Sequence, residues 1–165
     1  MPQITPEQMR EADERFLKTA YSGNELHVRA SQYALEQVSD PEIRALAEHL
    51  IRDHEQAGKA TAQVANAEDV HLADELLSDR PKLLPPHKAM LESAMEVKGD
   101  AFASVYLFNM ASLHVHDILD FSHEATHSPS AAIRAFASQT LPTLQEHYAQ
   151  IKPLAARKAG LTSGL

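Results

Sequence analysis

The chain has 165 residues, 44% of them hydrophobic and 23% charged, and we expect residues 1–165 to form one globular domain. Its formal net charge of −8 disfavours nucleic acid as a partner, because phosphate binding requires a basic surface. The absence of cysteine excludes disulfides, thiolate metal ligands and cysteine nucleophiles. No apolar run reaches the length of a membrane span, so no membrane-spanning segment is expected.

The first predicted helix begins at a capping signal. Thr5 stands where a helix N-cap is expected, and Pro6 follows at the first helical position. Apolar residues then recur with the helical period, which predicts a helix over 6–38. Pro41 opens a second helix, predicted over 41–67. A turn this short makes the two helices antiparallel neighbours.

A long connection separates the second helix from the third. Prolines interrupt the helical period between residues 69 and 86, and a short extra helix is predicted over 87–97. Two further long helices are predicted over 100–127 and 130–158. No segment has the alternation of a β-strand, so the predicted fold is an all-α, up-down four-helix bundle.

Each long helix carries one histidine within its apolar stripe. In the second helix, for example, His54 continues the stripe of Leu46 and Leu50 in steps of four. Imidazole is a poor core filler and a good ligand for transition metals, so these histidines mark a candidate metal site. The four residues are His27, His54, His114 and His147.

The turns place these histidines at similar depth in the bundle. His27 and His54 lie about 12 and 14 residues from the first turn, which is about 20 Å along a helix axis. His114 and His147 lie about 14 and 18 residues from the last turn, which is about 22 and 28 Å. The four imidazoles therefore fit into one layer in the middle of the bundle.

Such a layer suits a single ion of zinc, copper or iron, held by three or four imidazoles. Asp117 is a weaker candidate ligand, about one helical turn beyond His114. A conventional di-iron site needs Glu-x-x-His pairs in the middle of helices. The two pairs of this chain end at His71 and His127, near helix ends or in the connection, and do not predict such a site.

The competing interpretation is that each histidine is a buried side chain with a hydrogen bond to a neighbouring helix. For any single histidine this is the simpler explanation. Four at one depth favour a ligand, because several hydrogen bonds would otherwise have to be satisfied together.

A second histidine group lies on another face of the third long helix. Its residues are His116, Asp120, His123 and His127. The spacing of His123 and His127 can chelate an ion weakly, but a solvated polar face explains the group more simply. Glu124 is 10 residues from His114, about 15 Å along the axis, and therefore belongs to a different site.

Several segments together resemble the DUF4142 family, a bacterial family of ferritin-like four-helix bundles. The likeness covers about residues 13–154. The segments that carry it are Ile51-Arg52-Asp53-His54, Phe102 with Tyr106, Met110 and His114, Glu124-Ala125, and Leu141-Pro142-Thr143-Leu144-Gln145-Glu146-His147. The resemblance implies a ferritin-like bundle and no defined biochemical role.

The chain departs from the family pattern in two places. His27 stands where relatives usually carry a glutamate, which implies a site richer in nitrogen, and Ala103 replaces an acidic residue. Family members usually begin with an export signal, and residues 1–5 show none. The chain as written is expected in the cytoplasm, whereas a processed form would be periplasmic.

Three functions follow as hypotheses. The first is a metal-binding bundle in metal handling or stress protection, with a metal ion as its partner. The second is a non-catalytic stress- or envelope-associated protein that acts through its surfaces and forms homo-oligomers. The third is a small-ligand carrier, because Pro142 predicts a helix kink that would open a pocket about one turn before His147.

Overall fold

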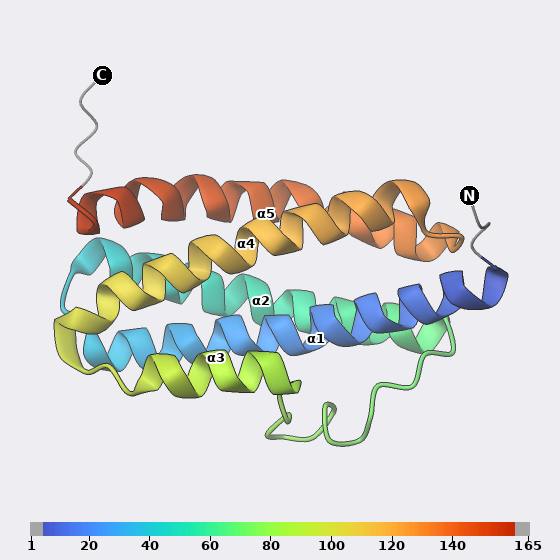
Figure 1. The fold of residues 1–165 in the computed structure, drawn as a ribbon, viewed down its shortest axis with the longest axis horizontal. Coiled ribbons are helices and arrows are strands. Elements are labelled where there is room, and N and C mark those ends of the chain that lie inside the picture. The colour runs from blue at the N-terminus through green and yellow to red at the C-terminus, as the bar shows by residue number, and fades with distance from the viewer. Residues whose placement is uncertain (1–4, 161–165) are drawn as a thin grey trace.

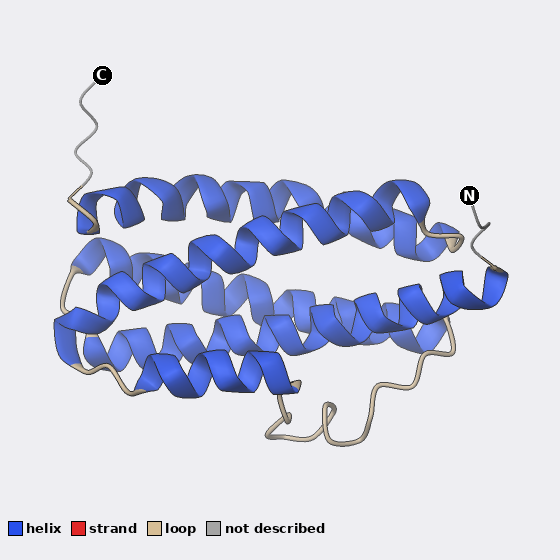
Figure 2. Ribbon diagram, viewed as in Figure 1, coloured by secondary structure: helices blue, strands red, loops and turns tan. Residues whose placement is uncertain are grey.

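The computed structural model describes residues 5–160, in which helices are joined by loops and no strand is present (Figure 2). This confirms the predicted all-α bundle. The ends of the single domain predicted over 1–165 lie outside the described residues. The elements are α1 (Pro6–Gln37), α2 (Pro41–Ala67), α3 (Pro85–Met95), the 3-10 helix η1 (Gly99–Ala101), α4 (Phe102–His127) and α5 (Ala131–Lys158).

The bundle consists of two helical hairpins joined by one crossover (Figure 1). α1 and α2 form the first hairpin, and α4 and α5 form the second. Between them the connection and α3 return along the bundle, so that α2 and α4 run in the same direction (Figure 1). A single long crossover of this kind is also the connectivity of ferritin-like folds.

The helix ends follow the capping residues. Thr5 and Gln8 form a capping box at α1, and the side chains of Asp40 and Ser130 accept backbone N–H groups at α2 and α5. The short helix α3 begins two residues before its predicted start, because prolines at its first two positions already have helical φ. The third long helix begins at Phe102, because residues 99–101 form η1 instead of a first α-helical turn.

The apolar core is divided into two clusters. One surrounds Leu26, Leu50 and Tyr106, and the other surrounds Phe16 and Phe121. Along each long helix, the buried histidine lies between residues of one cluster and residues of the other. A polar layer therefore separates two apolar halves of the core.

The helix α5 continues without interruption through Pro142 and Pro153. The kink at Pro142 stays a prediction, since a proline can bend a helix without ending it. Among the helices of residues 5–160, none is both long enough and apolar enough to cross a bilayer.

One buried hydrogen bond joins the two hairpins within the larger apolar cluster. The hydroxyl groups of Ser31 on α1 and Tyr106 on α4 lie 2.8 Å apart. Both side chains are almost completely buried, so neither hydroxyl has water as a substitute partner.

We expect Tyr106→Phe to lower the free energy of unfolding by about 1–2 kcal/mol, because the Ser31 hydroxyl is then left buried and unpaired. Adding Ser31→Ala should recover part of this loss, since both partners are then removed. Urea denaturation of the two single variants and the double variant measures the coupling. Purely additive losses would show that this bond does not stabilise the docking of the hairpins.

Candidate metal centre

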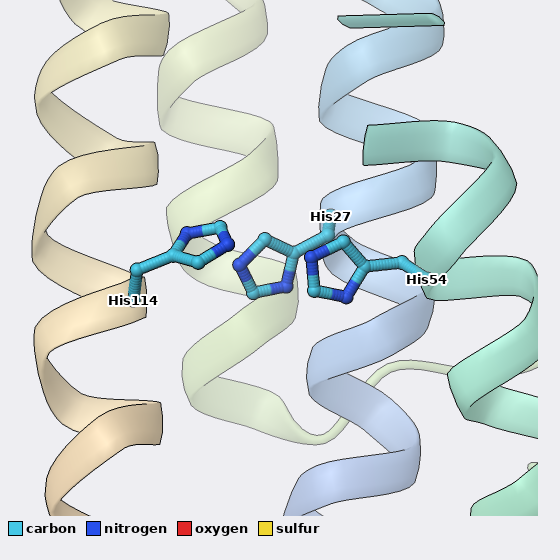
Figure 3. Close-up of side chains that lie close together, drawn as sticks. All are labelled: His27, His54 and His114. Carbon is cyan, nitrogen blue, oxygen red and sulfur yellow. The ribbon is translucent and has the colours of Figure 1, made fainter. Parts of the chain in front are cut away.

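Three of the four predicted histidines meet directly in the middle of the bundle (Figure 3). His27 from α1, His54 from α2 and His114 from α4 point toward one another. One ring nitrogen of each lies within 4.8 Å of the other two, and all three side chains are buried. The rings of His27 and His54 are stacked, with centroids 4.0 Å apart.

His147 completes the layer from α5. Its ring centroid is 5.3 Å from those of His54 and His114, and its side chain is 1% exposed. Nδ1 of His147 lies 3.2 Å from Nε2 of His114. The structure therefore brings all four sequence-predicted histidines into one cluster, which we call the inner cluster.

Each ring of the inner cluster has one nitrogen next to an oxygen acceptor. Nδ1 of His27 donates to the carbonyl oxygen of Gly23 at 2.7 Å, and Nδ1 of His114 donates to that of Met110 at 2.8 Å. Both acceptors lie one helical turn earlier on the same helix. Because Nδ1 of a neutral imidazole then carries the proton, Nε2 carries a lone pair.

Asn24 orients His54 in the same way. The amide nitrogen of Asn24 donates to the carbonyl oxygen of Ala20 at 2.9 Å, which turns its amide oxygen toward His54. Nδ1 of His54 donates to that oxygen at 2.8 Å. Sequence reasoning did not identify Asn24, although its position three residues before His27 puts it on the same helix face.

His147 is oriented by a carboxylate. Its Nε2 lies 2.9 Å from Oδ2 of Asp53, and we assign the proton to this nitrogen because a carboxylate can only accept. Nδ1 of neutral His147 then has a lone pair directed at Nε2 of His114. A histidine oriented by a carboxylate in this way is a common arrangement around metals.

The inner cluster thus gathers lone pairs without donors. Within the described residues, Nε2 of His27 and Nε2 of His54 are the buried side-chain atoms that lack a hydrogen-bond partner. Unpaired buried acceptors raise the free energy of a folded protein, and a proton or a metal ion relieves this penalty. Tetrahedral zinc holds nitrogen ligands about 3.3 Å from one another. The contact between His114 and His147 matches this separation. The parallel rings of His27 and His54 would have to turn for their in-plane lone pairs to meet at one ion.

Burial keeps these imidazoles neutral. It lowers the pKa of His27 and of His54 well below 6.5, and the neighbouring histidines lower both further. Burial also lowers the pKa of His114 to about 4, although the Met110 carbonyl acts in the opposite direction. The pKa of His147 is lowered by burial and partly restored by Asp53. Neutral imidazole is the form that binds metals.

Asp117 lies at the edge of the inner cluster, with Oδ2 3.7 Å from Nε2 of His27. Burial raises the pKa of Asp117 to about 7, and the negative charge of Asp120 adds to this effect. The structure therefore places this weaker candidate next to the histidines, without a hydrogen bond to them.

A cavity of about 30 Å³ adjoins the inner cluster. Among its lining residues are His54, Asp117 and His147, together with Thr143 next to Pro142. This volume accommodates about one water molecule. It is too small for an organic ligand.

A second group of ligand atoms lies on the solvent side of His147. Together with His147, it consists of His49 and Asp53, both partly exposed on α2. We call these three residues the outer cluster. Sequence reasoning missed His49 because it lies outside the apolar stripe of α2, and its only signal was the spacing of four residues to Asp53.

The surface histidines of α4 remain apart from both clusters. His123 and His127 are exposed and their rings stack, with centroids 4.4 Å apart. Glu124, by contrast, is buried. Burial and the neighbouring Asp13 raise the pKa of Glu124 to about 7.

These features define a helical bundle with a buried histidine cluster at its centre. The chain belongs to the DUF4142 family, described as a domain of unknown function, whose profile matches residues 1–154. Neither the curated proteins nor the solved structures contain a significant match.

We expect His54→Asn to make the metal-free protein less sensitive to acid. The unfolded chain binds a proton at His54 near pH 6.5 and the folded chain does not, so this residue destabilises the fold as pH falls below 6.5. Removing it should decrease the slope of unfolding free energy against pH by up to about 1.4 kcal/mol per unit. Urea denaturation from pH 4.5 to 8 measures the slope, and parallel curves would contradict neutral burial of His54.

Glu124→Gln should have the opposite pH signature. The folded pKa of Glu124 lies above its ordinary value of 4.5, so its ionisation destabilises the fold progressively from pH 4.5 to about 7. The variant should therefore gain about 1–2 kcal/mol over wild type above pH 7 after allowance for solvent screening, and little at pH 4.5. Thermal denaturation at both pH values tests this, and an equal effect at both would contradict it.

Proposed function

We propose that this protein binds one transition-metal ion in the inner cluster and takes part in metal handling or stress protection. The ligands are His27, His54, His114 and His147, and Asp117 is an additional carboxylate at the edge. The cavity next to His54 and His147 leaves room for a solvent molecule beside the ion.

The observation that supports this proposal is the arrangement of the ring nitrogens. All four imidazoles have one nitrogen against an oxygen outside the cluster. The second nitrogens of His27 and His54 have no hydrogen-bond partner, and those of His114 and His147 face each other at 3.2 Å. The outward hydrogen bonds hold the rings in the tautomer that ligation requires. A set of structural histidines would instead be expected to pair donors with acceptors inside the cluster.

The donor set favours zinc, copper or iron. Imidazole nitrogen suits these ions, whereas magnesium and calcium prefer oxygen ligands. The inner cluster contains no bridging glutamate, which is the ligand that holds a pair of iron ions together. We therefore propose one ion rather than two within this cluster.

Elemental analysis of untagged protein tests the proposal. After exposure to each metal and dialysis, wild type should retain about one ion per chain. His27→Asn/His54→Asn should retain none, because asparagine preserves a donor near the Nδ1 position but removes both Nε2 ligands. Circular dichroism verifies that the double variant is helical.

The matched control is His123→Ala/His127→Ala, which removes two exposed histidines from α4. It should retain the same tightly bound ion as wild type. Absence of bound metal in wild type, or equal retention in the inner-cluster variant, would overturn the proposal and leave the four histidines structural.

A separate observation supports the second hypothesis, in which the protein acts through its surfaces and forms homo-oligomers. α4 exposes Phe108, Val115 and Leu119, which are 71%, 40% and 61% exposed. Their spacing of seven and four residues puts them on one face of the helix. Such an apolar strip is typical of a protein that associates through its surface.

If the chain self-associates through this strip, its apparent mass should rise with concentration. Phe108→Ser/Leu119→Ser should then abolish the rise without affecting metal retention. Light scattering coupled to size-exclusion chromatography measures the mass. A monomer at all concentrations would remove this argument for a homo-oligomer.

A further inference from the structure

The outer cluster has an unusual arrangement of hydrogen-bonding groups around one oxygen. Oδ2 of Asp53 lies 2.9 Å from Nε2 of His147 and 3.1 Å from Nε2 of His49. His49 and Asp53 are one helical turn apart on α2, and His147 approaches from α5. Three ligand atoms from two helices thus gather within 4.8 Å of one another.

The orientation of His49 is determined on its far side. The amide nitrogen of Gln150 donates to Glu146, which directs the amide oxygen of Gln150 toward His49. Nδ1 of His49 donates to that oxygen at 3.1 Å. In neutral His49, the lone pair of Nε2 therefore faces the Asp53 carboxylate, an arrangement that requires a cation between them or a proton on Nε2.

Of the outer cluster, Asp53 lines a groove between α2 and α5. The groove has a volume of about 360 Å³ and is lined by Asp53, Gln56, Thr140 and Thr143, among other residues. Asp53 and Thr143 also line the small cavity beside the inner cluster. The outer cluster therefore lies between bulk solvent and the buried histidines.

We propose that His49, Asp53 and His147 form a second, solvent-accessible site for a divalent transition-metal ion, from which the inner cluster is loaded. Two imidazole nitrogens and one carboxylate oxygen are a common ligand set for zinc, and the groove leaves the remaining positions to water. The site holds an ion more weakly than the inner cluster because His49 and Asp53 are 29% and 31% exposed and remain partly hydrated. The loading role rests on the proposed function of the inner cluster.

His147 belongs to both clusters and connects them. Its Nδ1 faces His114 in the inner cluster, and its Nε2 faces Asp53 in the outer cluster. An ion that leaves the outer ligands therefore has the other nitrogen of the same ring ahead of it. Because neutral imidazole has one lone pair, His147 must release its remaining proton to solvent and bridge as an imidazolate when both clusters hold an ion. The two nitrogens of this ring are separated by the width of one imidazole.

Zn²⁺ binding and Co²⁺ loading of the metal-free protein test this inference. Equilibrium dialysis should show two zinc ions per wild-type chain and one in His49→Asn, which preserves a donor toward Gln150 but removes the Nε2 ligand. Stopped-flow absorbance should show that cobalt loads the inner cluster at least about tenfold more slowly in this variant, a loss typical of removing a group that supports a metal site.

His71→Asn is the matched control, because His71 is an exposed histidine 4.0 Å from Asp74 without a third ligand. It should bind and load like wild type. The inference would be overturned if wild type binds one ion and His49→Asn retains it, or if the loading rate is unchanged. His49 and Asp53 would then be only an ion pair.

The same series separates the two proposals. If the outer site exists and the inner site does not, wild type and His27→Asn/His54→Asn should each bind one weak ion, and His49→Asn should bind none. If only the inner site exists, His27→Asn/His54→Asn should lose the single ion that His49→Asn retains.

Discussion

The centre of this bundle is governed by the hydrogen-bonding capacity of neutral imidazole, which has one donor and one acceptor. Four such rings are buried in one layer, and in each the donor is directed outward to a carbonyl, amide or carboxylate oxygen. The acceptors therefore face one another where no donor is present. Two apolar clusters lie on either side of this layer, so water cannot replace the missing donors freely. The free energy of unfolding must consequently depend on whether these acceptors gain a proton or a metal ion.

The topology makes this layer a contact between the two halves of the chain. The α1–α2 hairpin contributes His27, His54 and Asn24, whereas the α4–α5 hairpin contributes His114 and His147. Neither hairpin has the complete set, and the hairpins also meet through the buried pair of Ser31 and Tyr106. An ion bound by residues of both hairpins would stabilise their docking, because binding energy available only to the folded state adds to its stability. If the inner cluster binds an ion as proposed, metal binding and folding are coupled at the interface between the two hairpins.

The sequence predicts the helices and the inner histidines well, for a clear physical reason. Helical periodicity reports which face of a helix is buried, and the distance from a turn reports depth, so His54 and His147 could be placed in one layer. Periodicity does not report which helices are neighbours. The long connection and the family resemblance indicated a ferritin-like bundle, and the structure shows the crossover that makes α2 and α4 parallel. Nor does it detect a ligand outside the stripe, as with His49. The roles of Asn24 and Asp53 depend on which ring nitrogen they contact, and sequence spacing does not report this.

The shortage of carboxylates in the inner cluster has a consequence for the proposed ion. Carboxylates at di-iron centres offset the charge of the metals, whereas the four imidazoles here contribute none. Asp117 is the nearest carboxylate to His27, and Asp53 reaches the cluster only through His147. A divalent ion with one ionised aspartate leaves a single positive charge in a buried layer, and a trivalent ion leaves two. Because burying uncompensated charge is costly, this environment favours the lower oxidation state of copper or iron over the higher one. Binding of a cation also favours ionisation of Asp117, whose pKa burial otherwise holds near neutrality.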